Sequence, residues 1–215
     1  MSLQIKLDAI TEEVRRLVQP ERLEPNERAV ADLQASGAVE RILPAGVKAP
    51  EFTLPDHNMK LVRSSDLFGI GPVVIKFFRG RWCPYCMTEL ETYAELYPRI
   101  REAGGLLVAI SPQTVRQNDF AIQQYHFKFP LLHDASNAVA RAFGLVYKIP
   151  EYHQQHYSSV LVNLPFINGD KSWELPLPAT YVIDQDRTVL YASACADFRT
   201  RPEPDEVMQA LISRK

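Results

Sequence analysis

Cys83 and Cys86 are separated by two residues, and this spacing makes them the residues of the chain best suited to thiol chemistry. Two thiols one helical turn apart can alternate between a dithiol and a disulfide. One thiol attacks an electrophile, and the other releases the product. We therefore interpret Cys83 as the attacking thiolate and Cys86 as the resolving thiol.

The residues around this pair predict a strand that leads into a helix. Residues 73–78 are rich in β-branched and aromatic side chains, which is typical of a buried strand, and Pro84 suits the first turn of a helix. Cys83 then lies at or near the helix cap, where unpaired N–H groups and the helix dipole stabilise a thiolate. Because Arg79 and Arg81 add positive charge, we expect the pKa of Cys83 to lie below its usual value of about 8.5.

Two other interpretations of the cysteine pair stay open, namely two buried thiols or half of a zinc site. Zinc normally takes four ligands, the chain has no second cysteine pair, and its histidines do not have the usual spacing of zinc ligands. These histidines are His57, His126, His133, His153 and His156. We expect His153 and His156 to be solvated in a proline-rich loop, and we expect no metal.

Three further side chains are candidates for the site. We interpret Trp82 as a shield that keeps water from the dithiol and offers an apolar docking face, with plain core packing as the alternative. Cys195 lies in or just after a predicted strand and is expected to be a small buried residue, with a second resolving cysteine as the alternative. Arg201 either approaches the site or lies on the surface.

The composition indicates a soluble protein of ordinary size. The chain has 215 residues, 46% of them hydrophobic, a formal net charge of -2 and no cluster of basic residues, so nucleic-acid binding is disfavoured. Its beginning lacks the pattern of a signal peptide, and no apolar run reaches the length of a membrane span. Three cysteines make no disulfide framework. We therefore expect a cytoplasmic protein that does not bind membranes.

Residues 1–44 predict a helical extension, and the main domain is expected to cover residues 45–215. Apolar side chains at helical spacing indicate one helix over residues 3–18, stopped by Pro20, and a second that starts near Pro25. A short apolar piece follows at residues 39–43. We expect this extension to pack on the main domain or on a second subunit.

Strands and helices alternate through the first part of the main domain. In chain order the pattern predicts a strand at 73–78, a helix at about 84–102, a strand at 106–110, a helix at roughly 114–125, a short strand at 131–132 and a helix at 136–143. Asp134 can cap the last of these helices. The alternation favours a mostly parallel sheet covered on both faces, with the cysteines at the carboxyl end of a central strand.

The chain departs from this alternation after residue 146. Residues 146–178 show no clear periodicity, so they predict a long insertion. Residues 179–184 and 188–193 then predict a hairpin of two strands about a tight polar turn, and a last helix is expected at about 204–212.

Four segments in this order carry a resemblance to a known family: residues 49–54, 82–86, 108–113 and 178–184. They resemble the peroxiredoxin-like branch of the alkyl hydroperoxide reductase and thiol-specific antioxidant (AhpC/TSA) family. The resemblance covers about residues 45–213 and implies an α/β thioredoxin-like fold with a central mixed sheet flanked by helices. It also implies that Pro84 and Tyr85 support the cysteines and that Pro178 is a cis-proline facing them.

Peroxiredoxins carry a Pro-x-x-x-Thr/Ser-x-x-Cys motif, which this chain does not match. Counting back from Cys83 places Lys76 and Gly80 where the motif has proline and a hydroxyl residue, while counting back from Cys86 places Arg79 and Cys83 there. The first hypothesis is therefore dithiol–disulfide exchange in redox homeostasis, without a cofactor beyond the Cys83–Cys86 disulfide.

Two other hypotheses remain. One is a thiol peroxidase that reduces hydrogen peroxide or organic hydroperoxides. The other is a redox-inert interaction module. The resemblance further implies a protein disulfide or a peroxide as substrate, a reductant of the thioredoxin or glutathione type, and a possible homodimer.

Overall fold

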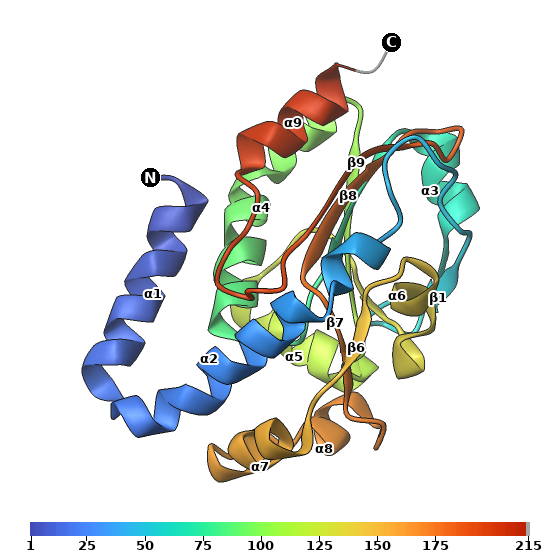
Figure 1. Ribbon diagram of the computed structural model, residues 1–215. Coiled ribbons are helices and arrows are strands. Elements are labelled where there is room, and N and C mark those ends of the chain that lie inside the picture. Colours follow the sequence, from blue (N-terminus) through green and yellow to red (C-terminus); the bar gives the residue numbers. More distant parts are fainter. Residues whose placement is uncertain (214–215) are drawn as a thin grey trace.

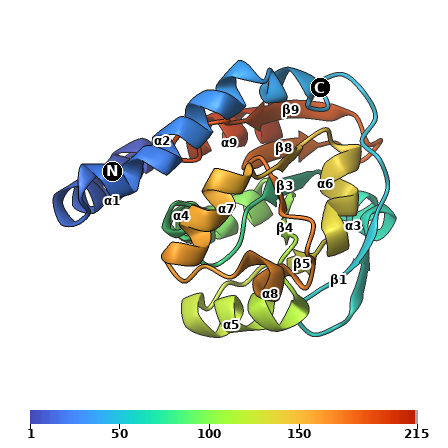
Figure 2. The ribbon, with the colours of Figure 1, turned by 60° about the horizontal axis from the view of Figure 1, so that its bottom comes forward.

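A computed structural model describes residues 1–213, and its centre is a five-stranded sheet of strand order β5-β4-β3-β8-β9 (Figures 1 and 2). The strands are β3 (Val73–Phe77), β4 (Leu106–Ser111), β5 (Leu131–His133), β8 (Ala179–Ile183) and β9 (Val189–Ala194). Strands β3, β4 and β5 run parallel, whereas β8 runs antiparallel to both β3 and β9. The expected mixed sheet is confirmed, and the mostly parallel arrangement holds only for the part of the chain where strands and helices alternate.

Strand β3 lies in the middle of the sheet, and its side chains alternate between two hydrophobic cores. Val74 belongs to the core shared with α4 (Pro84–Glu102) and α9 (Pro204–Ile212). Val73, Ile75 and Phe77 belong to the opposite core, which includes residues of α3 (Ser64–Ile70) and α6 (Ala138–Ala142). Successive strand residues face opposite sides, and burying each such side chain contributes about 1.5–3 kcal/mol. The strand that leads to the cysteines is therefore held on both faces.

The helices of the alternating region begin and end close to their expected positions, with one exception. Helices α4 and α9 have the expected bounds, and α5 covers Val115–Tyr125. The helix expected at 136–143 is instead a 3-10 turn, η2 (Ala135–Asn137), followed by α6, because Ser136 and Asn137 have φ values of 53° and 55°. Asp134 still caps α6 by accepting hydrogen bonds from the amides of Val139 and Ala140.

The N-terminal region consists of α1 (Leu3–Leu17), α2 (Pro20–Ala35) and the 3-10 turn η1 (Ala38–Arg41). The expected start of the second helix near Pro25 is wrong: α2 begins at Pro20 and Pro25 lies inside it. Proline at the first helical position has no intrahelical N–H bond to lose, so Pro20 ends one helix and also starts the next.

Helix α1 is fastened to the main domain at three places. Leu3 and Leu7 are buried in the core shared with α4, and the Thr11 and Tyr85 hydroxyls lie 3.2 Å apart. The Glu203 carboxylate accepts hydrogen bonds of 2.9 Å from the amides of Leu3 and Gln4. These amides belong to the first turn of α1, which has no intrahelical partners for them. The extension therefore packs on its own chain.

Residues 146–178, where the sequence predicts a long insertion, contain secondary structure of their own. They form β6 (Val146–Lys148), α7 (Glu151–Ser159), α8 (Leu164–Asn168) and β7 (Glu174–Pro176), with β6 and β7 paired antiparallel. A small third core joins Ile149, Tyr157, Leu164 and Leu175. The inner face of α7 consists of tyrosine and histidine instead of aliphatic residues, which is why hydrophobic periodicity does not reveal it.

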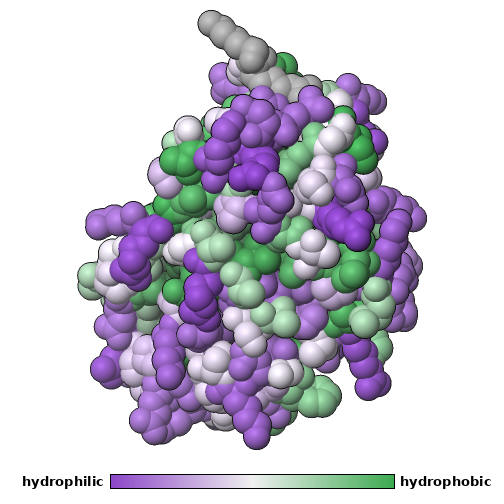
Figure 3. All heavy atoms as spheres, turned by 90° about the vertical axis from the view of Figure 1, so that its right-hand side faces the viewer, coloured by the Kyte–Doolittle hydropathy of each residue, from purple (hydrophilic) through white to green (hydrophobic). Residues whose placement is uncertain are grey.

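The remaining elements form a short hairpin. The molecular surface in Figure 3 carries both hydrophilic and apolar side chains. Strands β1 (Thr53–Pro55) and β2 (Leu61–Arg63) pair antiparallel ahead of α3. On the face shown in Figure 3, hydrophilic side chains dominate the rim and apolar ones show between them towards the middle. Among the described residues, no helix combines the length and the apolar character that a membrane span requires.

Candidate active site

The turn between β3 and α4 places Cys83 at the N-terminus of the helix. Gly80 has a φ of 142°, and a Cβ at this position would lie 2.5 Å from Nε1 of Trp82, so the tight turn requires glycine. Cys83 is the N-cap residue of α4, and Pro84 is the first helical residue, as the sequence predicts. Both Cys83 and Cys86 are free thiols with no exposed surface. Cys86 lies one turn into the helix.

Arg79 is the closest cation to the first cysteine, since its Nη2 donates a hydrogen bond of 3.0 Å to Cys83 Sγ. Burial by itself raises the pKa of Cys83, but a hydrogen bond from Cys86 and the charges of Arg79 and Arg201 outweigh it and bring the pKa well below its usual value. The expected direction of the shift is therefore found. The two largest causes that lower the pKa of Cys83 are the hydrogen bond from Cys86 and the charge of Arg79. The sequence analysis considered Arg79 and the helix N-terminus but not the second thiol.

The second cysteine has the opposite shift. Burial, together with the hydrogen bond to Cys83 and the negative charge of the Cys83 thiolate, raises the pKa of Cys86 well above its usual value. Nη2 of Arg201 lies 3.8 Å from Cys86 Sγ and partly offsets this. The two opposite shifts favour a thiolate on Cys83 and a protonated thiol on Cys86. This asymmetry suits an attacking Cys83 and a resolving Cys86.

A buried ion-pair network lies directly behind Cys86, and the sequence analysis missed most of it. One oxygen of Glu89 pairs with Lys76 of β3, and the other accepts a hydrogen bond of 2.8 Å from Nε of Arg201. Lys76 also donates to the Thr180 hydroxyl of β8. The side chains of all three charged residues have only 1% of their surface exposed. Arg201 is therefore a residue of the site, which settles one of the two alternatives left open by the sequence.

Aromatic rings enclose the guanidinium of Arg79. Its Cζ lies 4.0 Å from the ring centre of Phe198 and 5.0 Å from that of Trp82, and Nη1 is 3.5 Å from the Tyr157 hydroxyl. Trp82 packs edge-on against Tyr157, and Tyr85 packs edge-on against Phe198. Trp82 is half-buried and packs against the core that contains both cysteines. The shielding role expected for it stays a prediction. Cation–π contacts of this kind hold a buried guanidinium in place.

Three predicted site residues lie apart from the two thiols or differ from expectation. Arg81 turns to α5, where its Nε donates to Gln117 at 2.7 Å, so its expected contribution to the Cys83 thiolate is not seen. Pro178 is not a cis-proline, because residues 1–213 contain no cis peptide bond, and its carbonyl accepts a hydrogen bond from the Cys195 amide. Cys195 is half-buried, less enclosed than expected.

The expectation that His153 is solvated is also wrong. His153 lies on α7 with 3% of its surface exposed, and its Nε2 lies 2.9 Å from Oδ1 of Asn26 on α2. Burial lowers the pKa of His153 to about 4, so the ring is neutral at physiological pH. Among residues 1–213, no three His, Cys, Asp or Glu side chains form a group able to hold a metal ion.

We expect Arg79→Gln to raise the pKa of Cys83 by about 1–2 units, since a hydrogen bond to a charged group contributes about 1.5–3 kcal/mol and one pKa unit corresponds to 1.36 kcal/mol. The measurement is thiolate absorbance against pH in the reduced protein. Arg81→Gln is the matched control, because Arg81 is two residues away and bonds to Gln117. Equal shifts in the two variants would contradict a specific Arg79–Cys83 hydrogen bond.

Comparisons with known proteins give consistent results. The sequence model of the AhpC/TSA family matches residues 45–192. "Thiol-disulfide oxidoreductase ResA" of Bacillus thuringiensis is 26% identical over 155 residues, which cover 70% of this chain and 70% of that protein. "Putative peroxiredoxin bcp" of Coxiella burnetii is 30% identical over 101 residues, which cover 47% of this chain and 66% of that protein.

A solved structure is similar over most of the chain. "Peroxidoxin BcpB" from Mycobacterium tuberculosis has a TM-score of 0.64 and 25% sequence identity, over 80% of this chain and 99% of that chain. The relatives thus include proteins named for thiol–disulfide chemistry and proteins named as peroxiredoxins.

Proposed function

Since the chain belongs to the AhpC/TSA family and is a thiol-based oxidoreductase of thioredoxin-like fold, we propose that it catalyses dithiol–disulfide exchange through Cys83 and Cys86. The observation that carries this proposal is the electrostatic asymmetry of the pair. Arg79 donates to Cys83 Sγ at 3.0 Å, while burial and the neighbouring Cys83 raise the pKa of Cys86 one turn later.

The proposed reaction has two steps. The Cys83 thiolate attacks one sulfur of the substrate disulfide, the substrate S–S bond breaks, and one substrate thiolate leaves. Cys86 then loses its proton to solvent or to the leaving thiolate and attacks the Cys83 sulfur, which releases the second substrate thiol. The substrate is reduced by two electrons and the pair becomes a Cys83–Cys86 disulfide. A thioredoxin- or glutathione-type thiol is the proposed reductant that restores the dithiol.

The surroundings of the pair are suited to holding the thiolate between attacks. The positive end of α4 and the guanidinium of Arg79 stabilise the negative charge on Cys83, and the rings of Phe198 and Trp82 pack against Arg79. The network of Lys76, Glu89 and Arg201 fixes Arg201 beside Cys86. Arg201 is therefore a positioning residue. It favours ionisation of Cys86 in the second step, when Cys86 attacks the Cys83 sulfur.

A thiol peroxidase is the second candidate, and the enclosure of the thiol favours it. Cys83 Sγ has no exposed surface, which suits a substrate as small as a peroxide. In this reaction the Cys83 thiolate attacks one peroxide oxygen, the O–O bond breaks, and a sulfenic acid and an alcohol or water form. Attack by Cys86 then releases water and gives the same disulfide. Lys76 and Gly80 in the positions of the peroxiredoxin proline and hydroxyl residue weigh against this reaction.

Stopped-flow fluorescence of Trp82 separates the two reactions. The Trp173→Phe protein leaves Trp82 as the only tryptophan, and the reduced protein is mixed with hydrogen peroxide, with oxidised glutathione or with a disulfide-bonded protein. We expect the fastest change with a disulfide. Faster oxidation by peroxide than by both disulfides would overturn exchange in favour of the peroxidase. Trp82→Phe, which keeps Trp173, is the control that assigns the signal to Trp82.

We also propose a location and an assembly. The cytoplasm fits a chain with three cysteines, because disulfide-stabilised secreted proteins usually have more. A homodimer is a further proposal, made by analogy with the family.

A further inference from the structure

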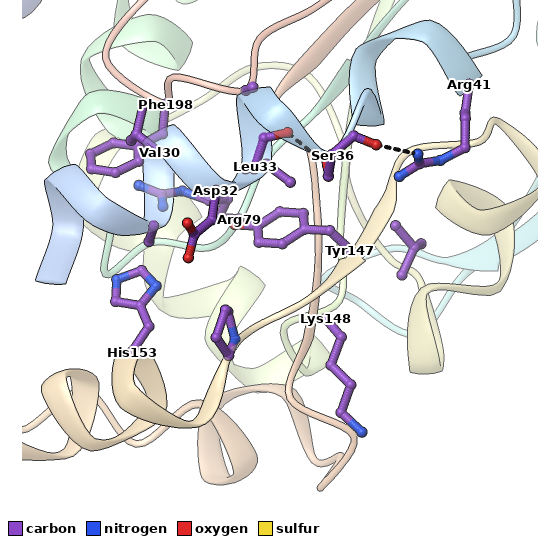
Figure 4. A pocket seen from close by; sticks show the side chains of 14 residues that line it. Val30, Asp32, Leu33, Ser36, Arg41, Arg79, Tyr147, Lys148, His153 and Phe198 are labelled. Carbon is purple, nitrogen blue, oxygen red and sulfur yellow. Dashed lines mark hydrogen bonds between the residues drawn. The ribbon is translucent and has the colours of Figure 1, made fainter.

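A cavity of about 350 Å³ lies beneath α2 and reaches the cation that holds the Cys83 thiolate. Figure 4 shows its walls: Val30 and Leu33 of α2 on one side, Tyr147 and Lys148 of β6 on the other. Arg79 and Phe198 form part of the wall and are shared with a second cavity of about 190 Å³, which Trp82 and Pro84 line from the cysteine side. Arg79 therefore lines both cavities, and the larger one contains no residue of the turn that carries the cysteines.

The charges around the larger cavity favour an anion. Arg79, Arg41 and Lys148 line it, and Asp32 is its only carboxylate. Arg28 offsets its charge, with Nε 3.8 Å from Asp32 Oδ2, and the same oxygen accepts a hydrogen bond of 2.7 Å from Tyr152 on α7. His153 adds no charge because its pKa is lowered to about 4. The rest of the wall is largely apolar.

Arg79 lines this cavity and has a buried donor without a partner. Its side chain is buried, with 3% of the residue exposed, and its Nε has no hydrogen-bond partner among the described residues. Nη1 and Nη2 are directed to Tyr157 and Cys83. A buried donor without an acceptor costs free energy, so an oxygen acceptor in the cavity would satisfy Nε.

The charge partner of Arg79 depends on the redox state of the cysteines. With Cys83 as a thiolate, the guanidinium has an anion 3.0 Å away. In a Cys83–Cys86 disulfide the sulfur is neutral, and a buried guanidinium without an anion is costly. An anion entering the cavity would then replace the thiolate as the partner of Arg79.

We propose that the cavity beneath α2 binds an organic carboxylate with an apolar body, anchored on Arg79, and binds it more tightly when Cys83 carries no negative charge. The preference for the disulfide state rests on the proposed function, whereas the site itself does not. By linkage, a bound carboxylate stabilises the disulfide relative to the dithiol by the same factor.

Three probes with one apolar body test the proposal: 4-phenylbutyrate, 4-phenylbutan-1-ol and 4-phenylbutylammonium. Calorimetric titration is done on the dithiol protein above the pKa of Cys83, on the disulfide protein and on Cys83→Ala. We expect 4-phenylbutyrate to bind the disulfide and Cys83→Ala proteins at least about tenfold more tightly than the dithiol protein, as a charge-assisted hydrogen bond implies. Equal affinity for the carboxylate and the alcohol would overturn the anchoring on Arg79.

The Cys83→Ala arm keeps this test independent of the redox reaction. Binding of 4-phenylbutyrate to Cys83→Ala supports the site even if the wild-type protein shows no disulfide exchange. Absence of binding to both the disulfide protein and Cys83→Ala would overturn the site even if exchange is fast.

Surface variants provide the second readout. Lys148 and Arg41 are exposed, so Lys148→Gln and Arg41→Gln are expected to fold. Each should weaken 4-phenylbutyrate severalfold while leaving 4-phenylbutan-1-ol unchanged. Lys60→Gln is the matched control, because Lys60 is exposed and lies outside the cavity. Equal weakening by all three variants would contradict a located site.

Discussion

Cys83→Ser should abolish turnover with any disulfide or peroxide substrate, by about 10³-fold or more, the scale typical for loss of a nucleophile. A serine hydroxyl keeps its proton where Cys83 is a thiolate, so Arg79 has no anion to stabilise. Cys86→Ser should instead keep the first step and lose the second. Mass spectrometry should then show an adduct on Cys83, a mixed disulfide or a sulfenic acid according to the substrate.

Cys195→Ser is the control for both variants, because it changes the third cysteine and leaves the pair intact. It should retain wild-type turnover. Full turnover of Cys83→Ser would refute the assignment of the nucleophile. An enzyme that loses both Cys83 and Cys86 without any change in its cellular role would favour the redox-inert interaction module.

Glu89→Gln should destabilise the protein by about 3–5 kcal/mol at neutral pH, the cost of breaking a buried ion pair by removing one partner. Burial raises the pKa of Glu89, but Lys76 and Arg201 together lower it below its usual value. The carboxylate is therefore ionised, and its loss leaves two buried cations facing each other. Such a loss is a large part of the 5–15 kcal/mol of a typical domain.

Denaturant unfolding of the reduced protein measures this change as a lower midpoint at an unchanged slope. Glu91→Gln is the control, since Glu91 is exposed on the same helix and should shift the stability by no more than about 0.5 kcal/mol. A loss below 1 kcal/mol in Glu89→Gln would contradict a tightly coupled network. The thiol pKa of Cys86 should also fall in this variant, because Arg201 then faces it without a counter-ion.

Local sequence signals were sufficient for the elements that carry the cysteines. The apolar run before Gly80 and the proline after Cys83 specify β3 and the start of α4, and both are determined by neighbouring residues. Arg79 lies only four residues before Cys83, so its position near the thiol is also determined by neighbouring residues. Hydrophobic periodicity likewise predicts α9, whose apolar side chains pack against α4 and the sheet.

The residues behind Cys86 could not be placed because their contacts are distant along the chain. Glu89 meets Arg201 across 112 residues and Lys76 meets Thr180 across 104. A lysine in the middle of a buried strand was the one available signal, since buried lysine is rare unless paired. Tyr157 was missed for another reason, because α7 has an aromatic and polar inner face that resembles a loop in sequence.

The distance between Cys86 and Arg201 also matters while the protein is being made. The ribosome translates Cys86 115 residues before Arg201, which at about 5–20 residues per second takes roughly 6–23 s. Arg79 is translated before Cys83, so the nucleophile has its cation from the start, whereas the cation beside the resolving thiol arrives late. An oxidant acting on the nascent chain therefore meets a cysteine pair whose electrostatic environment differs from that of the folded protein.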